Sequence, residues 1–277
     1  MTISVDLSGK TVLVTGVSSG LGRDLARAFT HAGAYVVGTA RRESLGRALE
    51  DELKDLRGTF EFKVGDVSQV SDCVRLVDEA VKANGGLDIL VNNAAVRTDP
   101  PLMSLDEVDE ANFDRVIDIN LKSAFFMTKF ASRVMRSRGG GVIINIASHT
   151  AEQATKGMSV YVASKAGLVQ LTRATAVEFF DYGIRANVVL LGGTATGQEK
   201  RTAAAETSNS AGPPQPPTVD PSAWLTDPGD ISRAIVALSD DDCGVITGAS
   251  IAMDRGVTAG AMTSAFTHQL IAAVRNG

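Results

Sequence analysis

A tyrosine and a lysine in the second half of the chain, Tyr161 and Lys165, have the types and spacing of a proton-transfer pair. They are four positions apart in a segment expected to be helical, so their side chains share one face of that helix. Ser148 follows an apolar strand at residues 143–146, and active-site groups of open α/β sheets gather where such strands end. Asn120 lies within an apolar helical stripe, where a buried amide needs a partner. Together these four groups could exchange a proton with an oxygen atom of a ligand.

Each of these residues also has a purely structural interpretation. A tyrosine and a lysine at this spacing arise often by chance, and Lys165 could simply be exposed to solvent. Asn120 could be a core amide whose hydrogen bonds are satisfied within the fold. The four residues together, preceded by a glycine-rich turn, are harder to explain without a shared site.

The glycine-rich turn follows a short apolar run at residues 11–15 and opens an expected helix. Glycine permits a tight turn and lets the backbone approach a pyrophosphate, while the helix N-terminus offers free N–H groups and a partial positive charge. The alternative is that these glycines only allow the chain to turn. The candidate pyrophosphate-binding residues are Gly16, Ser18, Ser19, Gly20, Leu21 and Gly22.

The end of the second expected strand, residues 35–39, indicates which dinucleotide would bind. An Asp or Glu there would accept a hydrogen bond from the adenosine 2′-hydroxyl of NAD(H), and none occurs before Glu43. Arg41 and Arg42 stand there instead, and either guanidinium can pair with the 2′-phosphate of NADP(H). The sequence therefore favours NADP(H) over NAD(H), unless the two arginines are only solvated residues at a helix start.

Apolar runs alternate with amphipathic stretches along most of the chain. This alternation predicts a parallel sheet with helices on both faces, and runs of Val, Ile and Leu are typical of strands buried on both sides. We therefore predict an α/β fold in which residues 1–277 form a single Rossmann-type domain on a doubly wound parallel sheet. The expected strands are 11–15, 35–39, 60–64, 89–91, 142–146 and 185–189, and the expected helices after the first are 43–57, 69–84, 105–137 and 159–180.

Residues 195–227 interrupt the alternation. They contain five of the eight prolines of the chain, and proline fixes φ and removes a backbone donor, so no continuous helix crosses the segment. A long segment of this kind in a compact domain is either a disordered surface loop or a lid over the site. Composition does not decide between these two interpretations.

The bulk composition narrows the class of protein. Of the 277 residues, 44% are hydrophobic and 21% are charged, which is ordinary for a globular protein. The net charge of −5 argues against a general nucleic-acid binder. The two cysteines and three histidines lack metal-ligand spacing, and neither a leader segment nor a long apolar run is visible. We therefore expect a cytoplasmic protein with no metal, nucleic-acid or membrane partner.

In their order along the chain, these motifs resemble those of the short-chain dehydrogenase/reductase family. The resemblance covers roughly residues 7–256. It rests on the turn at 15–22, on Asp66-Val67, on Asn92-Asn93-Ala94-Ala95, on Asn120, Ser148, Tyr161 and Lys165, and on the stretch from Asn187 to Thr196.

The resemblance implies a role for each catalytic candidate. Tyr161 would be the general acid/base, and Lys165 would hold the nicotinamide ribose and lower the pKa of the tyrosine. Ser148 would orient and polarise a substrate carbonyl, and Asn120 would support a water relay to the lysine. A free tyrosine has a pKa of about 10, so a nearby ammonium and an oxidised nicotinamide would have to stabilise its anion.

The same resemblance implies further cofactor contacts. Asp66 and Val67 match positions beside the adenine, and Asn93 and Ala94 match the stretch along the adenosine ribose. The loop after the last expected strand supplies three more candidates, Gly192, Thr194 and Thr196.

Three positions depart from the pattern of the family. Ala95 stands where the family usually has glycine, Leu191 replaces a proline, and Arg255 interrupts an Asp-Gly-Gly sequence. None of them removes a catalytic candidate, although Leu191 could alter the loop that leads to residues 195–227. The C-terminal extension, residues 257–277, is longer than expected and could reach a neighbouring subunit.

Two other residues could face a substrate. Arg97, after the fourth expected strand, could bind an anionic group, although a solvated arginine is the simpler interpretation. His149 directly follows Ser148, and a loop histidine without a catalytic role is again the simpler interpretation.

The leading hypothesis is an NADP(H)-dependent oxidoreductase that interconverts a carbonyl and an alcohol of a small molecule by hydride transfer. A second is an NAD(H)-dependent dehydrogenase of a sugar, a steroid or another secondary alcohol. A third, from another class, is a non-catalytic dinucleotide-binding scaffold or sensor, which the presence of all four catalytic candidates disfavours. Members of the family usually pair two long helices, here 105–137 and 159–180, so a homotetramer, or else a homodimer, is expected.

Overall fold

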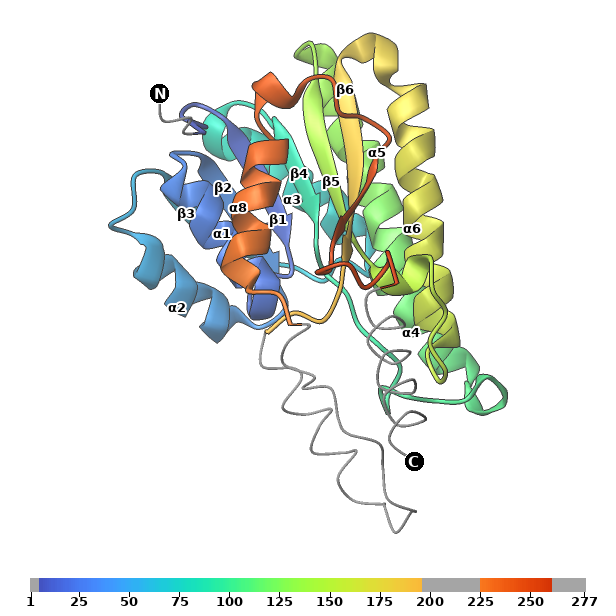
Figure 1. Ribbon diagram of the computed structural model, residues 1–277. Helices are drawn as coiled ribbons and strands as arrows, with labels where there is room; N and C mark the ends of the chain where they lie inside the picture. Colours follow the sequence, from blue (N-terminus) through green and yellow to red (C-terminus); the bar gives the residue numbers. More distant parts are fainter. Residues whose placement is uncertain (1–4, 196–224, 261–277) are drawn as a thin grey trace, which may run out of the picture.

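A computed structural model describes residues 5–195 and 225–260 of the chain. Seven strands, all paired in parallel, form one sheet in the order β3-β2-β1-β4-β5-β6-β7 (Figure 1). The strands are β1 (Thr11–Thr15), β2 (Tyr35–Ala40), β3 (Thr59–Val64), β4 (Ile89–Asn92), β5 (Gly141–Ser148), β6 (Ile184–Leu191) and β7 (Ser250–Met253).

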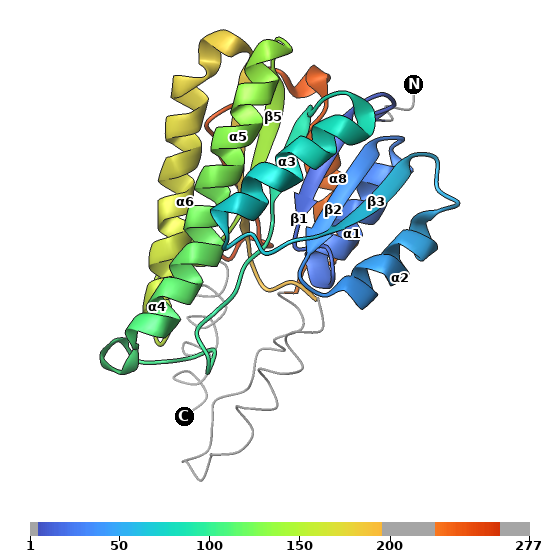
Figure 2. The same cartoon turned by 180° about the vertical axis from the view of Figure 1, so that it is seen from behind.

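Helices cover both faces of this sheet (Figure 1, Figure 2). One face carries α1 (Gly20–His31), α2 (Glu43–Leu53) and α8 (Pro228–Leu238), and the opposite face carries α3 (Val70–Asn84), α5 (Ser123–Ser137) and α6 (Ser159–Glu178). The predicted doubly wound α/β fold is therefore confirmed.

Alternate residues of β1 pack into separate parts of the core. Val12 and Val14 are fully buried in a cluster with Leu25 of α1, on one face of the sheet. Leu13 is buried in a second cluster with Met127 of α5, on the other face. Since both faces are covered, β1 needs apolar residues at consecutive positions, which is why its sequence does not alternate.

The order of the strands reverses at β1. The chain runs outward from β1 through β2 to β3, and then returns to β4 on the other side of β1. In open α/β sheets, ligands bind outside the carboxyl ends of the strands at such a reversal. The segments that follow β1 and β4 are therefore placed to form one binding crevice.

The expected helix at 105–137 is divided into several elements. A short 3-10 helix, η1 (Leu105–Glu107), ends at Val108, whose backbone is extended. The helix α4 (Glu110–Ile117) begins after Asp109, whose side chain accepts from the Asn112 N–H as an N-cap. A π-helical turn, η2 (Asp118–Lys122), then joins α4 to α5. The apolar periodicity predicts one helix because the N-cap and the π turn shift the helical register but leave the spacing of apolar residues in place.

The two unusual segments of the sequence are mostly outside the described residues. This holds for most of residues 195–227, including Thr196, and for most of 257–277. The two described ends of the first segment lie side by side, because the Ala195 N–H donates to the Thr226 carbonyl over 3.1 Å and the Thr226 N–H donates to the Gly193 carbonyl over 2.8 Å. In the part of the chain that the structure describes, no helix is long and apolar enough to span a bilayer.

Candidate active site

A cavity of about 940 Å³ runs along the carboxyl ends of the strands. Its walls come from the segments after β1, β2, β3, β4, β5 and β6 and from the start of α6. Asn120 does not line the cavity, and Thr196 is not described. The predicted residues that do line it are Gly16, Ser18, Ser19, Gly20, Leu21, Gly22, Arg41, Arg42, Asp66, Val67, Asn93, Ala94, Ser148, Tyr161, Lys165, Gly192 and Thr194.

The glycine-rich turn after β1 is packed closely against itself. Gly16 has a left-handed φ of +78°, which glycine adopts without steric cost. A Cβ atom on Gly22 would lie 2.2 Å from the Gly16 carbonyl oxygen and 2.6 Å from the Asn93 side-chain nitrogen. Both glycines are therefore required by the shape of the turn, which presents its backbone to the cavity.

The end of β4 is tied to the same turn. The Thr15 hydroxyl oxygen accepts from the N–H groups of Asn93 and Ala94, each over 3.0 Å. The Asn93 side-chain amide donates to the Thr15 carbonyl over 2.8 Å. The hydrogen bonds of Asn93 thus hold the ends of β1 and β4 together, and its side chain fixes the start of the glycine-rich turn.

Arg42 binds the hydroxyl groups of the turn from the end of β2. Its guanidinium donates to the oxygen of Ser18 and to the oxygen of Ser19, each over 2.8 Å. Ser19 occupies the N-cap position of α1 but does not cap the helix with its side chain. Arg41 is exposed and lines the same end of the cavity. Two guanidinium groups and two hydroxyls therefore gather beside the first helix N-terminus.

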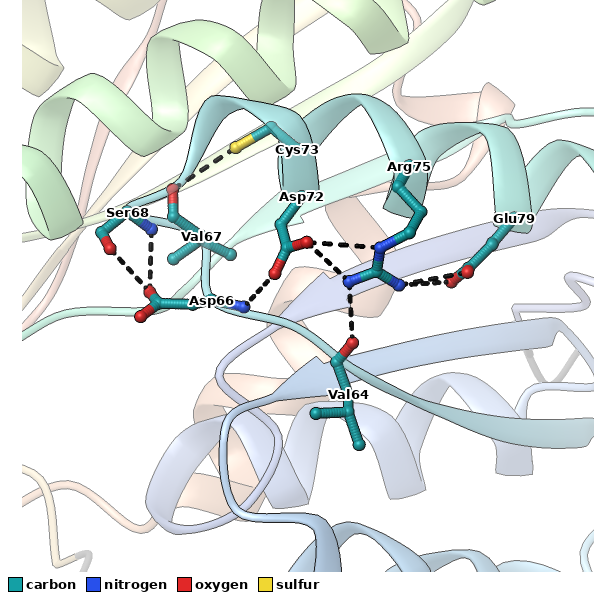
Figure 3. A network of polar contacts seen from close by, with 8 residues as sticks. All are labelled: Val64, Asp66, Val67, Ser68, Asp72, Cys73, Arg75 and Glu79. Atoms are coloured by element: carbon teal, nitrogen blue, oxygen red, sulfur yellow. Dashed lines mark hydrogen bonds and ion pairs between the residues drawn. The ribbon is translucent and has the colours of Figure 1, made fainter.

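A polar network holds the segment after β3 in place (Figure 3). The Asp66 N–H donates to the Asp72 carboxylate over 2.7 Å, and Arg75 donates to the same carboxylate over 2.8 Å and to the Val64 carbonyl over 3.0 Å. The hydrogen bond from the Asp66 backbone is the main cause that lowers the pKa of Asp72. Sequence reasoning missed Asp72 and Arg75; an acidic residue in the first turn of the following helix was the available signal.

Asn120 lies behind the cavity wall in the π-helical turn. It is 2% exposed, and its side chain accepts from the Val96 N–H over 2.8 Å and donates to the Val96 carbonyl over 2.9 Å and the Ser164 hydroxyl over 3.1 Å. The Ser164 hydroxyl donates in turn to the Tyr161 carbonyl. Asn120 is thus a satisfied buried amide that joins the segment after β4 to the helix that carries Tyr161. Single-turn π-helices of this kind are frequent at functional sites.

Lys165 is buried, which excludes the interpretation that it is simply a lysine exposed to solvent. Its side chain is among the largest fully buried ones, and its ammonium donates to the Ile146 carbonyl over 2.7 Å. Burial lowers the pKa of Lys165 to about 7, because the charged form loses its solvation. Its Nζ atom lies 5.7 Å from the centroid of the Tyr161 ring.

Burial raises the pKa of Tyr161, whereas the resemblance implied that Lys165 would lower it. Two groups act in the opposite direction to burial: the positive charge of Arg97 and a hydrogen bond to Ser148. The guanidinium carbon of Arg97 lies 5.8 Å from the centroid of the tyrosine ring. Desolvation is the largest of these three effects, because the phenolate would lose its solvation in the buried position.

Ser148 ends β5 beside Tyr161. Its hydroxyl oxygen accepts from the Thr150 N–H over 3.2 Å and thereby caps a short 3-10 helix, η3 (His149–Ala151). The next residue, His149, lines the cavity with its Nδ1 atom 3.2 Å from the Leu191 carbonyl oxygen. The phenol, the serine hydroxyl and the buried ammonium therefore converge at one end of the cavity.

A doubly wound sheet with a glycine-rich turn at one end of a cavity, and a tyrosine, a serine and a lysine at the other, defines a class of dinucleotide-dependent oxidoreductases. The sequence profile of the short chain dehydrogenase family matches residues 10–207. This chain therefore belongs to the short-chain dehydrogenase/reductase family. It is an oxidoreductase of alcohol and carbonyl groups that uses a nicotinamide dinucleotide.

Individual proteins are similar over nearly the whole chain. An uncharacterized oxidoreductase of Thermotoga maritima is 35% identical over 92% of this chain and 100% of that protein. A 3beta-hydroxysteroid dehydrogenase 2 of Eggerthella lenta is 34% identical over 91% of this chain and 96% of that protein. The crystal structure of a short-chain type dehydrogenase/reductase from Mycobacterium marinum matches with a TM-score of 0.80 and 28% identity, over 91% of this chain and 96% of the other.

Proposed function

We propose that this protein is an NADP(H)-dependent oxidoreductase that interconverts a carbonyl and an alcohol, with Tyr161 as the general acid/base. The observation that carries the proposal is the composition of the two ends of one cavity. Tyr161, Ser148 and Lys165 lie together at one end, and Arg41 and Arg42 lie at the other. The first end suits proton transfer to an oxygen atom, and the second suits a 2′-phosphate.

The described residues fit an NADP(H) molecule in chemical terms. Buried oxygen atoms of Thr39 and Thr150 have no hydrogen-bond partner among the described residues, and both threonines line the cavity. The N-terminus of α1, which opens from the turn, suits a pyrophosphate. We assign Asp66 and Val67 to the adenine, Asn93 and Ala94 to its ribose, Arg41, Arg42 and Ser18 to the 2′-phosphate, Tyr161 and Lys165 to the nicotinamide ribose, and Gly192, Thr194 and Thr196 to the remaining contacts.

The nicotinamide, when bound, supplies or accepts the hydride. In the reductive direction, the Tyr161 hydroxyl donates its proton to the substrate oxygen, and the Ser148 hydroxyl donates a hydrogen bond to the same atom. A raised pKa keeps the phenol of Tyr161 protonated at neutral pH, which suits reduction. We assign Lys165, which lines the cavity beside Tyr161, and Asn120, which lies outside the lining, to the relay of a proton from solvent.

The substitution Tyr161→Phe tests this proposal because it removes one oxygen atom and keeps the ring. Turnover of a carbonyl compound that the wild type reduces should fall by about 10²- to 10⁴-fold, the usual contribution of a general acid. Binding of NADPH, followed by nicotinamide fluorescence, should stay within about twofold. Tyr182→Phe is the matched control, because Tyr182 stacks on Arg136 and does not line the cavity. Full activity of Tyr161→Phe would contradict the mechanism.

We also propose that copies of the chain associate through the helices that follow β4 and β5. Large apolar side chains are exposed there: Phe113 is 47% exposed, Phe125 49%, Val177 80% and Phe180 68%. These side chains are distributed along α4, α5 and the end of α6, and an interface along these helices would remove them from water. Light scattering should give the mass of a homotetramer or a homodimer, and a monomeric mass would contradict the assignment.

A further inference from the structure

Arg97 lies at the Tyr161 end of the cavity and has no described counter-ion. It lines the cavity, and its guanidinium carbon is 5.8 Å from the centroid of the Tyr161 ring. Among the ion pairs and hydrogen bonds between described residues, none involves the guanidinium of Arg97. By contrast, Arg42 at the opposite end is bonded to two serines. The positive charge of Arg97 is therefore free to bind a ligand in the cavity.

The backbone that carries Arg97 is held on both sides. Asn120 makes two hydrogen bonds to the backbone of Val96, with lengths of 2.8 Å and 2.9 Å. Arg115 of α4 donates to the carbonyl of Arg97 itself over 2.7 Å. A side chain on a fixed backbone loses less freedom when it binds a ligand, so the position is suited to recognition.

Arg97 provides the positive charge beside Tyr161. The one carboxylate of the described lining is Asp66, which follows β3. Asp254 lies near His149, and hydrogen bonds from Thr258 and Gly256 outweigh the effect of burial and lower the pKa of its carboxyl. It does not line the cavity, however, and its oxygens accept from groups of its own loop.

We propose that Arg97 binds a carboxylate group of the substrate, so that the enzyme acts on hydroxy acids and oxo acids. The inference rests on the proposed function, because Tyr161 and Ser148 must place the reacting oxygen of the same molecule. A guanidinium matches a planar carboxylate with two parallel N–H groups, which gives both strength and direction. An oxo acid bound in this way would have its carbonyl at Tyr161 and its carboxylate at Arg97.

A binding experiment tests the site without turnover. The protein is loaded with NADPH, whose 2′-phosphate is expected to cover Arg41 and Arg42, and is titrated calorimetrically with malonate and with neutral malonamide. Wild type should bind malonate more tightly than malonamide, and Arg97→Met should weaken malonate by about tenfold or more, as the loss of a charge-assisted pair predicts. Arg133→Met is the matched control, because Arg133 lies on α5 outside the cavity lining. Equal affinities of wild type and Arg97→Met for malonate would overturn the proposal.

A kinetic experiment then identifies the anion. Three sets of carbonyl compounds are reduced by wild type, Arg97→Met and Arg97→Lys. They are oxo acids, their methyl esters, and phosphate esters of hydroxy ketones of similar length. The ratio of kcat/KM for acid over ester should exceed about tenfold in wild type, collapse in Arg97→Met, and recover partly in Arg97→Lys. Any effect of the Arg97 charge on Tyr161 changes the acid and the ester reactions alike, so the ratio of the two reports the contact with the carboxylate alone. Preference of the wild type for methyl esters or for phosphate esters would overturn the carboxylate assignment and leave the proposed role of Tyr161 intact.

Discussion

The Nζ atom of Lys165 donates a 2.7 Å hydrogen bond to the carbonyl oxygen of Ile146. Ile146 stands two residues before Ser148 on β5, and Lys165 stands one helical turn after Tyr161 on α6. The bond therefore ties the strand that ends in the serine to the helix that carries the tyrosine. It also holds the lysine in an environment that lowers its pKa to about 7.

The burial of Lys165 predicts a specific dependence of stability on pH. The unfolded chain protonates this lysine near its ordinary pKa of 10.5, and the folded chain only near 7. Between these pH values the unfolded state binds more protons, so the free energy of unfolding rises with pH. Between about pH 7.5 and about pH 9.5, wild type should gain roughly 2 kcal/mol relative to Lys165→Met.

Urea denaturation without added cofactor measures this difference. Tyr161 does not distort it, because burial raises the pKa of that phenol above its ordinary value of 10.0, so the stability linked to its titration is lost only above this window. Lys156→Met serves as the control, since Lys156 is exposed. A constant difference between wild type and Lys165→Met over this range would show that the lysine is solvated.

Asp72 should control cofactor affinity through the position of Asp66. Asp72→Ala removes the acceptor of the Asp66 N–H and the partner of Arg75, so the segment beside the adenine loses its anchor. We expect the dissociation constants of NADPH and NADH to rise together, by about tenfold. Asp72→Asn should have an intermediate effect, because its amide oxygen still accepts from Asp66 but no longer pairs as an ion with Arg75.

Cofactor fluorescence titrations distinguish this anchoring role from a general loss of stability. Asp78→Ala is the control, because Asp78 is an exposed acidic residue on the same helix, α3. It should leave both dissociation constants unchanged. A change in the ratio of NADPH to NADH affinity in Asp72→Ala would contradict the model of a shared adenine contact.

The arginines after β2 should act on NADPH alone. Arg41→Ala and Arg42→Ala each remove a cation beside the expected 2′-phosphate, so each should weaken NADPH by about tenfold or more and NADH by about twofold or less. The NADPH effect should shrink at high salt, since exposed charges are screened. Arg47→Ala is the control, because this nearby arginine pairs with Glu43 and Glu50. Tighter binding of NADH than NADPH by wild type would overturn the cofactor assignment.

The sequence predicted those parts of the fold that depend on local pattern. The first expected strand, 11–15, is the observed β1, and the expected helix 69–84 differs from α3 by one residue. The break at η2 was not predicted, because it involves hydrogen bonds between Asn120 and Val96, which are 24 residues apart. A pattern of apolar residues carries no information about such a contact. Neither β7 nor α8 was predicted, since both follow the proline-rich segment that interrupts the alternation.

In the candidate site, too, the sequence predicted the features that depend on local spacing and missed those that depend on tertiary contacts. The spacing of Tyr161 and Lys165 predicted that they share one face of a helix, and both residues line the cavity. It could not predict that the lysine is buried, because that depends on the backbone of Ile146 on another element. The same limit applies to Arg97, whose proximity to Tyr161 is a contact between β4 and α6 segments. Residue types indicated the chemistry, whereas tertiary contacts determined solvation and charge.

The close packing of the glycine-rich turn gives a last prediction, for Gly22→Ala. Alanine favours a helix at this position in α1, but its Cβ would lie 2.2 Å from the Gly16 carbonyl oxygen. That backbone is fixed, because the Gly16 N–H donates to the Thr39 carbonyl over 2.8 Å. The turn must therefore shift, and we expect a loss of about 2 kcal/mol in the free energy of unfolding. Because the shifted backbone no longer matches a pyrophosphate, NADPH and NADH should both bind about tenfold more weakly or worse.

Gly85→Ala separates this collision from simple backbone strain. Gly85 ends α3 with a left-handed φ of +79°, yet an added Cβ there meets no atom within 4 Å. It should therefore cost about 1 kcal/mol of stability, the usual penalty of that conformation, without any effect on cofactor affinity. Denaturant unfolding and fluorescence titration of both variants distinguish the steric collision from backbone strain. If Gly22→Ala folds stably and binds NADPH as wild type does, the turn has enough freedom to admit a methyl group, and the pyrophosphate cannot depend on its present shape.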